Sequence, residues 1–583
     1  MLPWLAMSLV AVPFLVTIIS VVGRHWHPSS DQGLELLRIR DVGGSHTPLL
    51  GAWSRWGWAH PGPLLFWTLA PWYRALGNNG VLVGVGVINL VSAIGVVLIG
   101  FRRGGDTGAV LAGLMVALVT RALGPGMLID PWNPWVAFLP SVVFLGLVWS
   151  VLCGDLAMLP VAVGVGSFVA QIHFGYMPLV GGLLLVALGA AVGWTVNRRR
   201  RRPVDHEPHA GRQSLFRRPL LLAGLVGAAL WAPVIVQQLT GTPGNVSSLL
   251  AYVRHPPEPA AGWSRAFDTM GEQLRPFGPW VTGHESTGPG LEQTASTIWA
   301  DATIVMVVAA GLWANKRGAK QAARLAIVSL IAIAIAVAAT ARVTGIFAPY
   351  VLRWWRGVAA LTYLSIAWSL LFSLGRRRIH AVTQGVAVTG MLAVAVVELF
   401  ALPAPLPFAP VSTAIGAVAR PTASALDRDR RYLVRSVDRR TLSAPTSGLF
   451  VALATRGFHV FSDRGPDALL MYGSWRLASP DQVDAVITMV AIPEIDAGWH
   501  APANSRVVAT FDPLTTEQRA RVRTLDEQIR AEVGAKASER LVADSNYARS
   551  AFVDDGANRK DVDELGRLQA IGDGFVVFVS PTH

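Results

Sequence analysis

Long apolar segments alternate with short polar ones over roughly the first 400 residues. The apolar runs are about 17–24 residues long, enough for a helix to cross a hydrocarbon core roughly 30 Å thick. They lie at about 4–22, 80–101, 107–123, 134–152, 156–172, 177–196, 219–239, 297–314, 323–343, 351–374 and 381–401. This pattern predicts a polytopic α-helical membrane protein with about 11 transmembrane helices. Since no basic stretch or small-residue cleavage site flanks the first run, we expect a retained span rather than a secretory signal.

Basic residues are concentrated in the short loops between these runs. The clusters are Arg102–Arg103; Arg198–Arg202 with Arg212, Arg217 and Arg218; Lys316, Arg317, Lys320 and Arg324; and Arg376–Arg378. Positively charged loops stay in the cytoplasm, and eleven crossings place every cluster there. The first outer loop, 23–79, the long outer loop, 240–295, and the C-terminal region then lie outside. The net charge of +13 therefore serves topology, and no nucleic-acid partner is expected.

The composition changes at about residue 402, where the proline-rich LPAPLPFAP cannot continue a helix. The segments RRYLVRSV and GFVVFVS are typical of short strands, and TTEQRARVRTLDEQIRAEVG is typical of an exposed helix. TSGLFVALATRGFHVF predicts a helix running into a strand. We therefore divide the chain into a membrane domain, 1–401, and a small extracytoplasmic α/β domain, 402–583.

Several functional classes lose support because their motifs are missing. The sequence contains no P-loop, no GxGxxG after a strand, no HExxH and no GxSxG in a strand–turn–helix setting. This argues against nucleotide-driven transport and soluble cofactor chemistry. The single cysteine, Cys153, excludes an internal disulfide and a cysteine-based metal site.

The first outer loop opens with acidic residues that are candidates for chemistry. If DQGLELLRIRDV is a short helix capped by Ser30, Asp31 and Glu35 lie one turn apart on the same face. A partly desolvated carboxylate at Asp31 could accept a proton from a substrate hydroxyl. The alternative is that Asp31 only caps the helix or pairs with Arg38.

The segment SRWGWAHPGPLLF, later in the same loop, combines basic and aromatic residues. Arg55 offers a fork of donors suited to phosphate, and His60 precedes a Pro-Gly-Pro turn that directs the loop back toward the membrane. The tryptophans fit either a sugar-stacking surface or a membrane interface. We predict that Arg55 and His60 bind substrate, with an aromatic belt and an interfacial histidine as the alternative.

Two other outer segments carry polar residues. DPWNPW contains Asp130 and Asn133, and Asp130 could orient an acceptor or pair with an arginine, or belong only to a structural turn. His173, in QIHFGY, ends the fifth run on the same side. It is a candidate substrate contact, with a satisfied packing histidine as the alternative.

Arginines at the outer ends of the runs break the positive-inside pattern. Arg353 and Arg356, in YVLRWWRG, begin the tenth run, and Arg342 and Arg121 lie close to the same face. One such residue can snorkel to the interface. Several converging on one leaflet predict an anionic ligand such as a lipid phosphate.

The long outer loop begins with QQLTGTPGNVSSLLAYV, which predicts the end of a span, a Gly-Pro turn and a helix lying along the membrane. Asn245-Val246-Ser247 fits an N-glycosylation sequon, although that triplet is common by chance. The Gly- and Pro-rich remainder, about 255–293, could cover a lipid-linked substrate.

A first span, an outer loop opening with an acid, and the HPP-like element His60-Pro61-Gly62-Pro63 together resemble the GT-C superfamily of integral-membrane glycosyltransferases. The chain is most similar to the branch of protein mannosyltransferases, aminoarabinose transferases and related bacterial enzymes. The resemblance covers the whole membrane region, with its sharp motifs in the first outer loop. The Ala-, Gly- and Arg-rich composition indicates an actinobacterium.

The resemblance implies helices around an outward-facing cavity, a polyprenyl-phosphate sugar donor, and transfer that usually inverts the anomeric centre. The first-loop acid of the family corresponds to Asp31 as general base, and the second-loop acid corresponds more loosely to Asp130. The phosphate-binding residues of the family have no fixed motif, so Arg55, Arg353 and Arg356 rest on the topology argument.

Two departures from the family pattern concern cofactors. Gln32 follows Asp31 where many relatives have a second acid, and the HPP element is HPGP. They leave the precise subfamily and a divalent metal open, and no other cofactor is expected.

We therefore expect a multi-pass enzyme of the plasma membrane that transfers a sugar to a glycan, lipid or protein of the cell envelope on the extracytoplasmic face. The main alternative is a transporter or flippase of a lipid-linked sugar. That class predicts internal pseudo-repeats and charges near mid-membrane, and the sequence shows neither clearly. A non-catalytic scaffold, with the C-terminal domain as its working part, is the third hypothesis.

Overall fold

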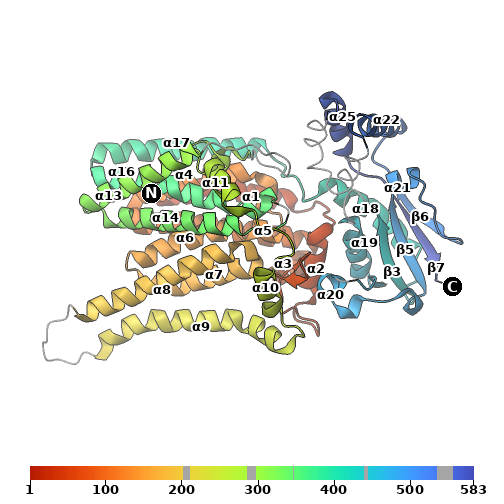
Figure 1. Ribbon diagram of the computed structural model, residues 1–583, viewed down its shortest axis with the longest axis horizontal. Coiled ribbons are helices and arrows are strands. Elements are labelled where there is room, and N and C mark those ends of the chain that lie inside the picture. The colour runs from red at the N-terminus through yellow and green to blue at the C-terminus, as the bar shows by residue number, and fades with distance from the viewer. Residues whose placement is uncertain are drawn as a thin grey trace.

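The structure of the protein is a computed structural model that describes residues 1–200, 210–284, 297–345, 347–438, 444–465, 467–534 and 556–582. A bundle of long helices forms one half, and a sheet with its helices forms the other (Figure 1). Residues 201–209, which include part of the largest arginine cluster, lie outside the described residues, and so does 285–296 of the long outer loop. The side chains of 197–200 and 210–217 are not described either.

The helical half confirms the fold class expected from the apolar runs. Within the described residues, nine helices are long and apolar enough to cross a membrane. One of them contains both the second and the third predicted run, and the fifth run forms a shorter apolar helix. The bundle helices are α1 (Leu2–Val21), α4 (Asn78–Leu123), α6 (Phe138–Leu152), α7 (Leu159–Ile172), α8 (Met177–Arg200), α9 (Ala210–Thr240), α13 (Ile298–Lys316), α14 (Lys320–Ala341), α16 (Trp355–Leu374) and α17 (Arg377–Phe400).

A pair of glycines reverses the chain inside α4. A straight helix of 46 residues would be about 69 Å long, more than twice the thickness of the hydrocarbon core. Gly104 and Gly105 leave helical geometry, Gly105 with a φ of +57°. The two halves then lie so close that a Cβ added at Gly108 would be 2.2 Å from the carbonyl oxygen of Gly100. This tight helical hairpin accounts for the two separate crossings predicted in this part of the chain.

Polar contacts bring several predicted inner loops together at one end of the bundle. Arg102 and Arg103 both form ion pairs with Asp155 at 2.5 Å, which ties the turn of α4 to the turn before α7. Trp149 Nε1 donates a 2.8 Å hydrogen bond to the carbonyl oxygen of Gln321, near the start of α14. These loops therefore share one end, as the positive-inside pattern requires.

Short elements connect the long helices to one another, and α2 also contacts the C-terminal region. Figure 1 shows α2, α3 and α10 at the end of the bundle nearest the sheet. The helices predicted for α2 and α10 are confirmed. The connecting elements are α2 (Ser30–Asp41), β1 (Trp53–Ser54), β2 (Trp58–Ala59), α3 (Leu64–Leu76), α5 (Asn133–Val136), α10 (Asn245–Arg254), α11 (Gly262–Gln273), α12 (Pro279–Thr282) and α15 (Pro349–Leu352).

A five-stranded mixed sheet confirms the α/β character of the C-terminal region. Its strand order is β4-β3-β5-β7-β6, with β3 parallel to both of its neighbours and β7 antiparallel to both of its own. Helices α18 (Ala409–Ser424) and α19 (Ala444–Thr455) lie between the sheet and the bundle (Figure 1). The domain boundary at 402 stays a prediction. The strands are β3 (Arg431–Val437), β4 (His459–Phe461), β5 (Ala485–Ala491), β6 (Arg506–Phe511) and β7 (Phe575–Pro581).

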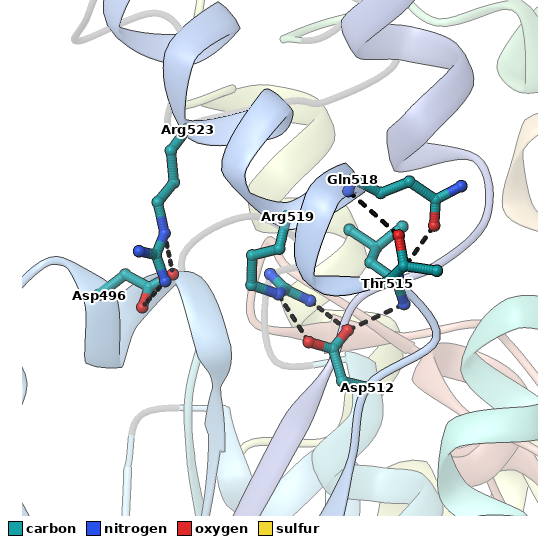
Figure 2. A network of polar contacts seen from close by, with 7 residues as sticks. Asp496, Asp512, Thr515, Gln518, Arg519 and Arg523 are labelled. Atoms are coloured by element: carbon teal, nitrogen blue, oxygen red, sulfur yellow. Dashed lines mark hydrogen bonds and ion pairs between the residues drawn. The ribbon is translucent and has the colours of Figure 1, made fainter.

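Helix α22 (Thr516–Val533), the predicted exposed helix, packs on α25 (Arg559–Gln569) beside the sheet. Figure 2 shows its first turn, where Thr515 Oγ1 accepts from the backbone N–H of Gln518 at 3.2 Å. Gln518 Oε1 accepts from the backbone N–H of Thr515 at 2.9 Å, which completes a capping box. Arg519 pairs with Asp512, just beyond β6.

The C-terminal region docks on α2 through specific polar contacts. Ser447 Oγ of α19 donates a 2.9 Å hydrogen bond to the carbonyl oxygen of Ser30. A Cβ added at Gly33 would lie 2.7 Å from the same hydroxyl oxygen, so this close approach requires glycine. At the other end of α2, Arg476 donates two hydrogen bonds to the carboxylate of Asp41, at 2.9 and 2.6 Å. Helix α2 is therefore fixed at both ends by residues more than 400 positions away.

We predict that the Arg476–Asp41 pair stabilises the protein. The Asp41 side chain is only 8% exposed, and Arg476→Ala would leave its charge buried without this partner, at a cost of about 3 kcal/mol in the free energy of unfolding. Arg523→Ala is the matched control, since its 2.7 Å pair with Asp496, shown in Figure 2, is 56% and 25% exposed. It should cost less than ~1 kcal/mol. Urea unfolding followed by tryptophan fluorescence measures both, and equal losses would contradict the prediction.

Candidate functional site

Helix α2 carries the two acids of the first outer loop into the junction between bundle and sheet. The helix begins at Ser30 and its N-cap is Ser29, without a side-chain capping bond, so the predicted cap at Ser30 is wrong. Asp31 Oδ2 accepts a 2.9 Å hydrogen bond from Trp132 Nε1. Glu35, one turn later and 2% exposed, accepts a 3.2 Å hydrogen bond at Oε1 from the backbone N–H of Asn133.

Asp130 approaches the same helix from the loop before α5. Its Oδ1 accepts 2.8 Å from Gln32 Nε2 and 2.9 Å from the backbone N–H of Trp132. The segment DPWN therefore lies along the first part of α2 and forms hydrogen bonds with Asp31, Gln32 and Glu35, which span about one helical turn. The structure thus brings together Asp31, Glu35 and Asp130, which lie in two separate predicted outer loops.

Burial changes the acidity of all three carboxyl groups. It raises the pKa of Asp31, an effect that the hydrogen bond from Trp132 partly offsets. Burial also raises the pKa of Asp130 to about 6, against the opposing bonds from Trp132 and Gln32. The pKa of Glu35 is raised well above its usual value, first by burial and then by the negative charge of Asp31. Since like charges so close cannot all ionise, we assign the proton to Glu35 and the charge to Asp31.

Asp31 and Glu35 line a small pocket with a cavity volume of about 20 Å³, room for roughly one water-sized group such as a hydroxyl. Arg38 and Trp53 line the same pocket, and Leu470 and Met471 close it from the C-terminal region. Arg38 Nη2 donates a 2.7 Å hydrogen bond to the carbonyl oxygen of Leu470. The interpretation of Asp31 as the partner of Arg38 is therefore not supported, because their hydrogen bonds go to Trp132 and Leu470.

The two predicted substrate-binding histidines lie side by side, with ring centroids 4.7 Å apart. His60 Nδ1 accepts a 2.9 Å hydrogen bond from the backbone N–H of Phe174, and His173 Nδ1 accepts 3.2 Å from that of Gly175. Burial lowers the pKa of His60 well below its usual value and that of His173 to about 4. Both rings are therefore neutral and carry their proton on Nε2. They join the first outer loop to the turn between α7 and α8.

The three candidate arginines occupy different places. Arg353 lies with its guanidinium carbon 4.0 Å from the ring centroid of Trp135 and donates to Met127 Sδ at 2.9 Å. Arg356, 2% exposed, donates to the carbonyl oxygens of Ala122 and Gly283 at 3.1 and 3.0 Å. Arg55 is exposed in the turn of the β1–β2 hairpin, 4.6 Å from the ring centroid of Trp56.

Aromatic rings in edge-on and tilted contact link Arg353 to the acids. Trp132, the hydrogen-bond donor to Asp31, lies 5.0 Å from Trp135 and 4.9 Å from Tyr350 between ring centroids. Trp135 in turn carries the guanidinium of Arg353. Through Trp135 and Trp132, a series of side-chain contacts therefore connects Arg353 to Asp31.

Several residues of the site were missed by sequence reasoning. Trp132 and Gln32 position the acids. In the sequence, Trp132 looks like any interfacial tryptophan and Gln32 like any polar loop residue, so neither could be recognised there. Asn245 was interpreted as a glycosylation sequon, but it is 4% exposed and bonds both the N–H and the carbonyl of Ala59 at 2.8 Å. A side chain so placed cannot carry a glycan, and that interpretation is wrong.

The described residues offer no group of three or more His, Cys, Asp and Glu side chains arranged to hold a metal ion. The acids on α2 instead accept hydrogen bonds from indole, amide and backbone groups. The fit of a divalent metal to this part of the chain is therefore poor, and no step of the chemistry below involves one.

Comparison with known proteins identifies the fold. Neither a protein-family model nor a curated protein sequence matches the chain. Its fold is similar to solved structures of ArnT from Cupriavidus metallidurans, one bound to undecaprenyl phosphate and one in the apo state. Each gives a TM-score of 0.51 at 14% sequence identity and covers 86% of this chain and 95% of that chain. The likeness confirms a helical polytopic membrane protein with a C-terminal sheet region.

We predict that Asp130→Asn stabilises the protein as the pH rises. A pKa of about 6 in the folded protein, against 3.8 ordinarily, gives stability that is present below pH 3.8 and lost as the pH rises to about 6. The loss is roughly 3 kcal/mol. The asparagine keeps an oxygen for Gln32 and the Trp132 N–H but cannot ionise. Urea unfolding between pH 4 and pH 7 should show that the free energy of unfolding of the variant rises relative to that of the wild type. Parallel plots of this free energy against pH would contradict the prediction.

Proposed function

We propose that the chain is a membrane glycosyltransferase that transfers a sugar from a polyprenyl-phosphate donor to a cell-envelope acceptor. The observation that carries the proposal is the placement of Asp31. Its carboxylate borders a pocket in the outer junction, next to a neutral Glu35, on a fold similar to that of a protein crystallised with undecaprenyl phosphate. The donor, the acceptor and the role of each side chain below belong to this proposal.

Asp31 is proposed as the general base. A carboxylate whose pKa is raised by burial is a stronger base than an exposed one, and proton removal of this kind contributes typically 10²–10⁴-fold to the rate. The hydrogen bond from Trp132 holds the carboxylate in position and keeps it ionised. Glu35 keeps its proton, because a second charge one turn away would be repelled. Asp130 positions Trp132 through the backbone.

The reaction is a single displacement. The acceptor hydroxyl gives its proton to Asp31, its oxygen bonds to the anomeric carbon, and the bond from that carbon to the phosphate oxygen breaks. Polyprenyl phosphate leaves with the electron pair, and the configuration inverts. No nucleotide is consumed, since the sugar–phosphate bond already stores the free energy.

Arg353 is proposed as the ligand of the donor phosphate. It lies just before α16 and contacts the Trp135 ring, whose neighbour Trp132 donates a hydrogen bond to Asp31. A cation there would stabilise the charge that develops on the leaving phosphate. Arg356 holds the end of α4 and residue 283 in place, and the exposed Arg55 offers attraction at the rim. The neutral histidine pair supports the loop that carries Arg55.

We predict that Asp31→Asn lowers transfer by 10²–10⁴-fold, the usual contribution of a general base. Glu35→Gln is the matched control, because it imitates the protonated carboxyl group and should lower transfer less than about tenfold. Radiolabelled short-chain polyprenyl-phosphate sugars and purified protein in detergent provide the assay. Full activity of Asp31→Asn would exclude this base. Absence of donor consumption in the wild type would favour a transporter, since detergent leaves no compartments to move it between.

We also propose that the site and the C-terminal region face away from the cytoplasm at the plasma membrane. The test uses Cys153→Ala, which removes the single cysteine of the chain. On that background, Asp429→Cys, in the exposed turn before β3, should react with a membrane-impermeant maleimide in intact cells. Asn315→Cys, exposed at the end of α13, should react only after lysis. The reverse pattern would invert the topology.

A further inference from the structure

We propose that the pocket between α2 and α20 (Ala468–Tyr472) is the acceptor subsite, and that it takes an uncharged carbohydrate hydroxyl. The C-terminal region thereby determines which acceptor is used. This inference rests on the proposed glycosyl transfer and names the class of its second substrate.

Two distant parts of the chain form the walls of this pocket. Asp31, Glu35 and Trp53 line the side that belongs to the first outer loop, and Leu470 and Met471 line the side that belongs to α20. The pocket therefore exists only where the C-terminal region is docked. An acceptor bound in it would touch both parts.

The second wall is held rigidly in place. The carbonyl oxygen of Leu470 accepts the 2.7 Å hydrogen bond from Arg38, and the Arg38 guanidinium lies 5.5 Å from the ring centroid of Trp475. His46 of the first outer loop also stacks on the Trp475 ring, with 4.0 Å between ring centroids and 7° between ring planes. Arg476, the next residue after Trp475, pairs with Asp41 of α2. A wall with so many fixed points can discriminate between shapes.

Two buried polar atoms of the pocket residues have no hydrogen-bond partner among the described residues: Trp53 Nε1 and Glu35 Oε2. A buried polar atom without a partner costs about 1–3 kcal/mol, and such atoms in a native protein call for a ligand or water. Trp53 can only donate, and a protonated Glu35 can donate or accept. A sugar hydroxyl both accepts and donates, so it satisfies the two atoms together.

The charge of the pocket favours a neutral ligand. Asp31 and Arg38 carry opposite charges and Glu35 is neutral, so the lining sums to zero. A phosphate placed here would face the Asp31 carboxylate. The negatively charged donor phosphate is placed at Arg353 instead, which leaves the pocket to the hydroxyl of a neutral acceptor.

The test fills the pocket without touching the acids. Met471→Trp adds bulk to the wall, and overfilling of this kind costs enough to raise the KM for a neutral p-nitrophenyl glycoside at least tenfold. The dissociation constant of the donor should stay within about twofold, because the proposed donor side at Arg353 is untouched. Leu469→Trp is the matched control: it lies on the same helix, is 54% exposed, and should change neither quantity by more than about twofold.

A second, smaller substitution distinguishes the loss of an acceptor contact from a folding defect. Trp53→Phe keeps the ring and removes the N–H, and the loss of one hydrogen bond should raise the glycoside KM roughly fivefold. The same glycosides carrying a phosphate should be poor acceptors for the wild type. If the wild type transfers sugar but Met471→Trp and Trp53→Phe leave the glycoside KM unchanged, or if phosphorylated glycosides are preferred, the acceptor subsite is wrong. If the wild type consumes no donor, the proposed transfer itself is wrong.

Discussion

The structure depends on the burial of three carboxyl groups in one small volume at the junction between the helical bundle and the C-terminal region. Asp31, Glu35 and Asp130 are removed from water where ionisation is costly, and the surrounding chain supplies a donor for each of them. Trp132 serves two of these groups at once, through its indole for Asp31 and its backbone for Asp130. This burial is tolerated because the loop before α5 lies against α2 and supplies hydrogen-bond donors to the acids. The docked C-terminal region covers the same place. A base of raised pKa is the chemical result.

Aromatic rings beside the acids, and two sets of hydrogen bonds farther out, hold the first outer loop in place. The Trp132 ring contacts Trp135 and Tyr350, and Trp135 contacts the Arg353 guanidinium. The neutral histidine pair and Asn245 bind the first outer loop to the α7–α8 turn and to α10, in each case through backbone groups. Contacts of this kind fix geometry without adding charge. The electric field around Asp31 therefore comes from few charged groups, which is favourable for the role of general base proposed for it.

The sequence predicted what periodicity and charge control. The apolar runs located the crossings, the strand-like segments of the C-terminal region appeared as β3 and β7, and acids placed one turn apart did enter one pocket. Contacts over long separations were beyond its reach. Nothing in Leu470 or Met471 shows that they would close a pocket opened by Asp31, since that depends on the docking of α19 through Gly33 and Ser447. The cap at Ser30 and the sequon at Asn245 failed because local patterns do not reveal burial.

The Arg38–Leu470 and Asp41–Arg476 contacts join residues separated by 432 and 435 positions. Synthesis and insertion proceed from the N-terminus, so the first loop reaches its compartment long before α20 exists. During that interval the pocket beside Asp31 has no second wall. A nascent chain therefore lacks the complete pocket, which forms only when residues of the last third of the polypeptide have docked. The order of synthesis makes this pocket one of the last features of the molecule to form.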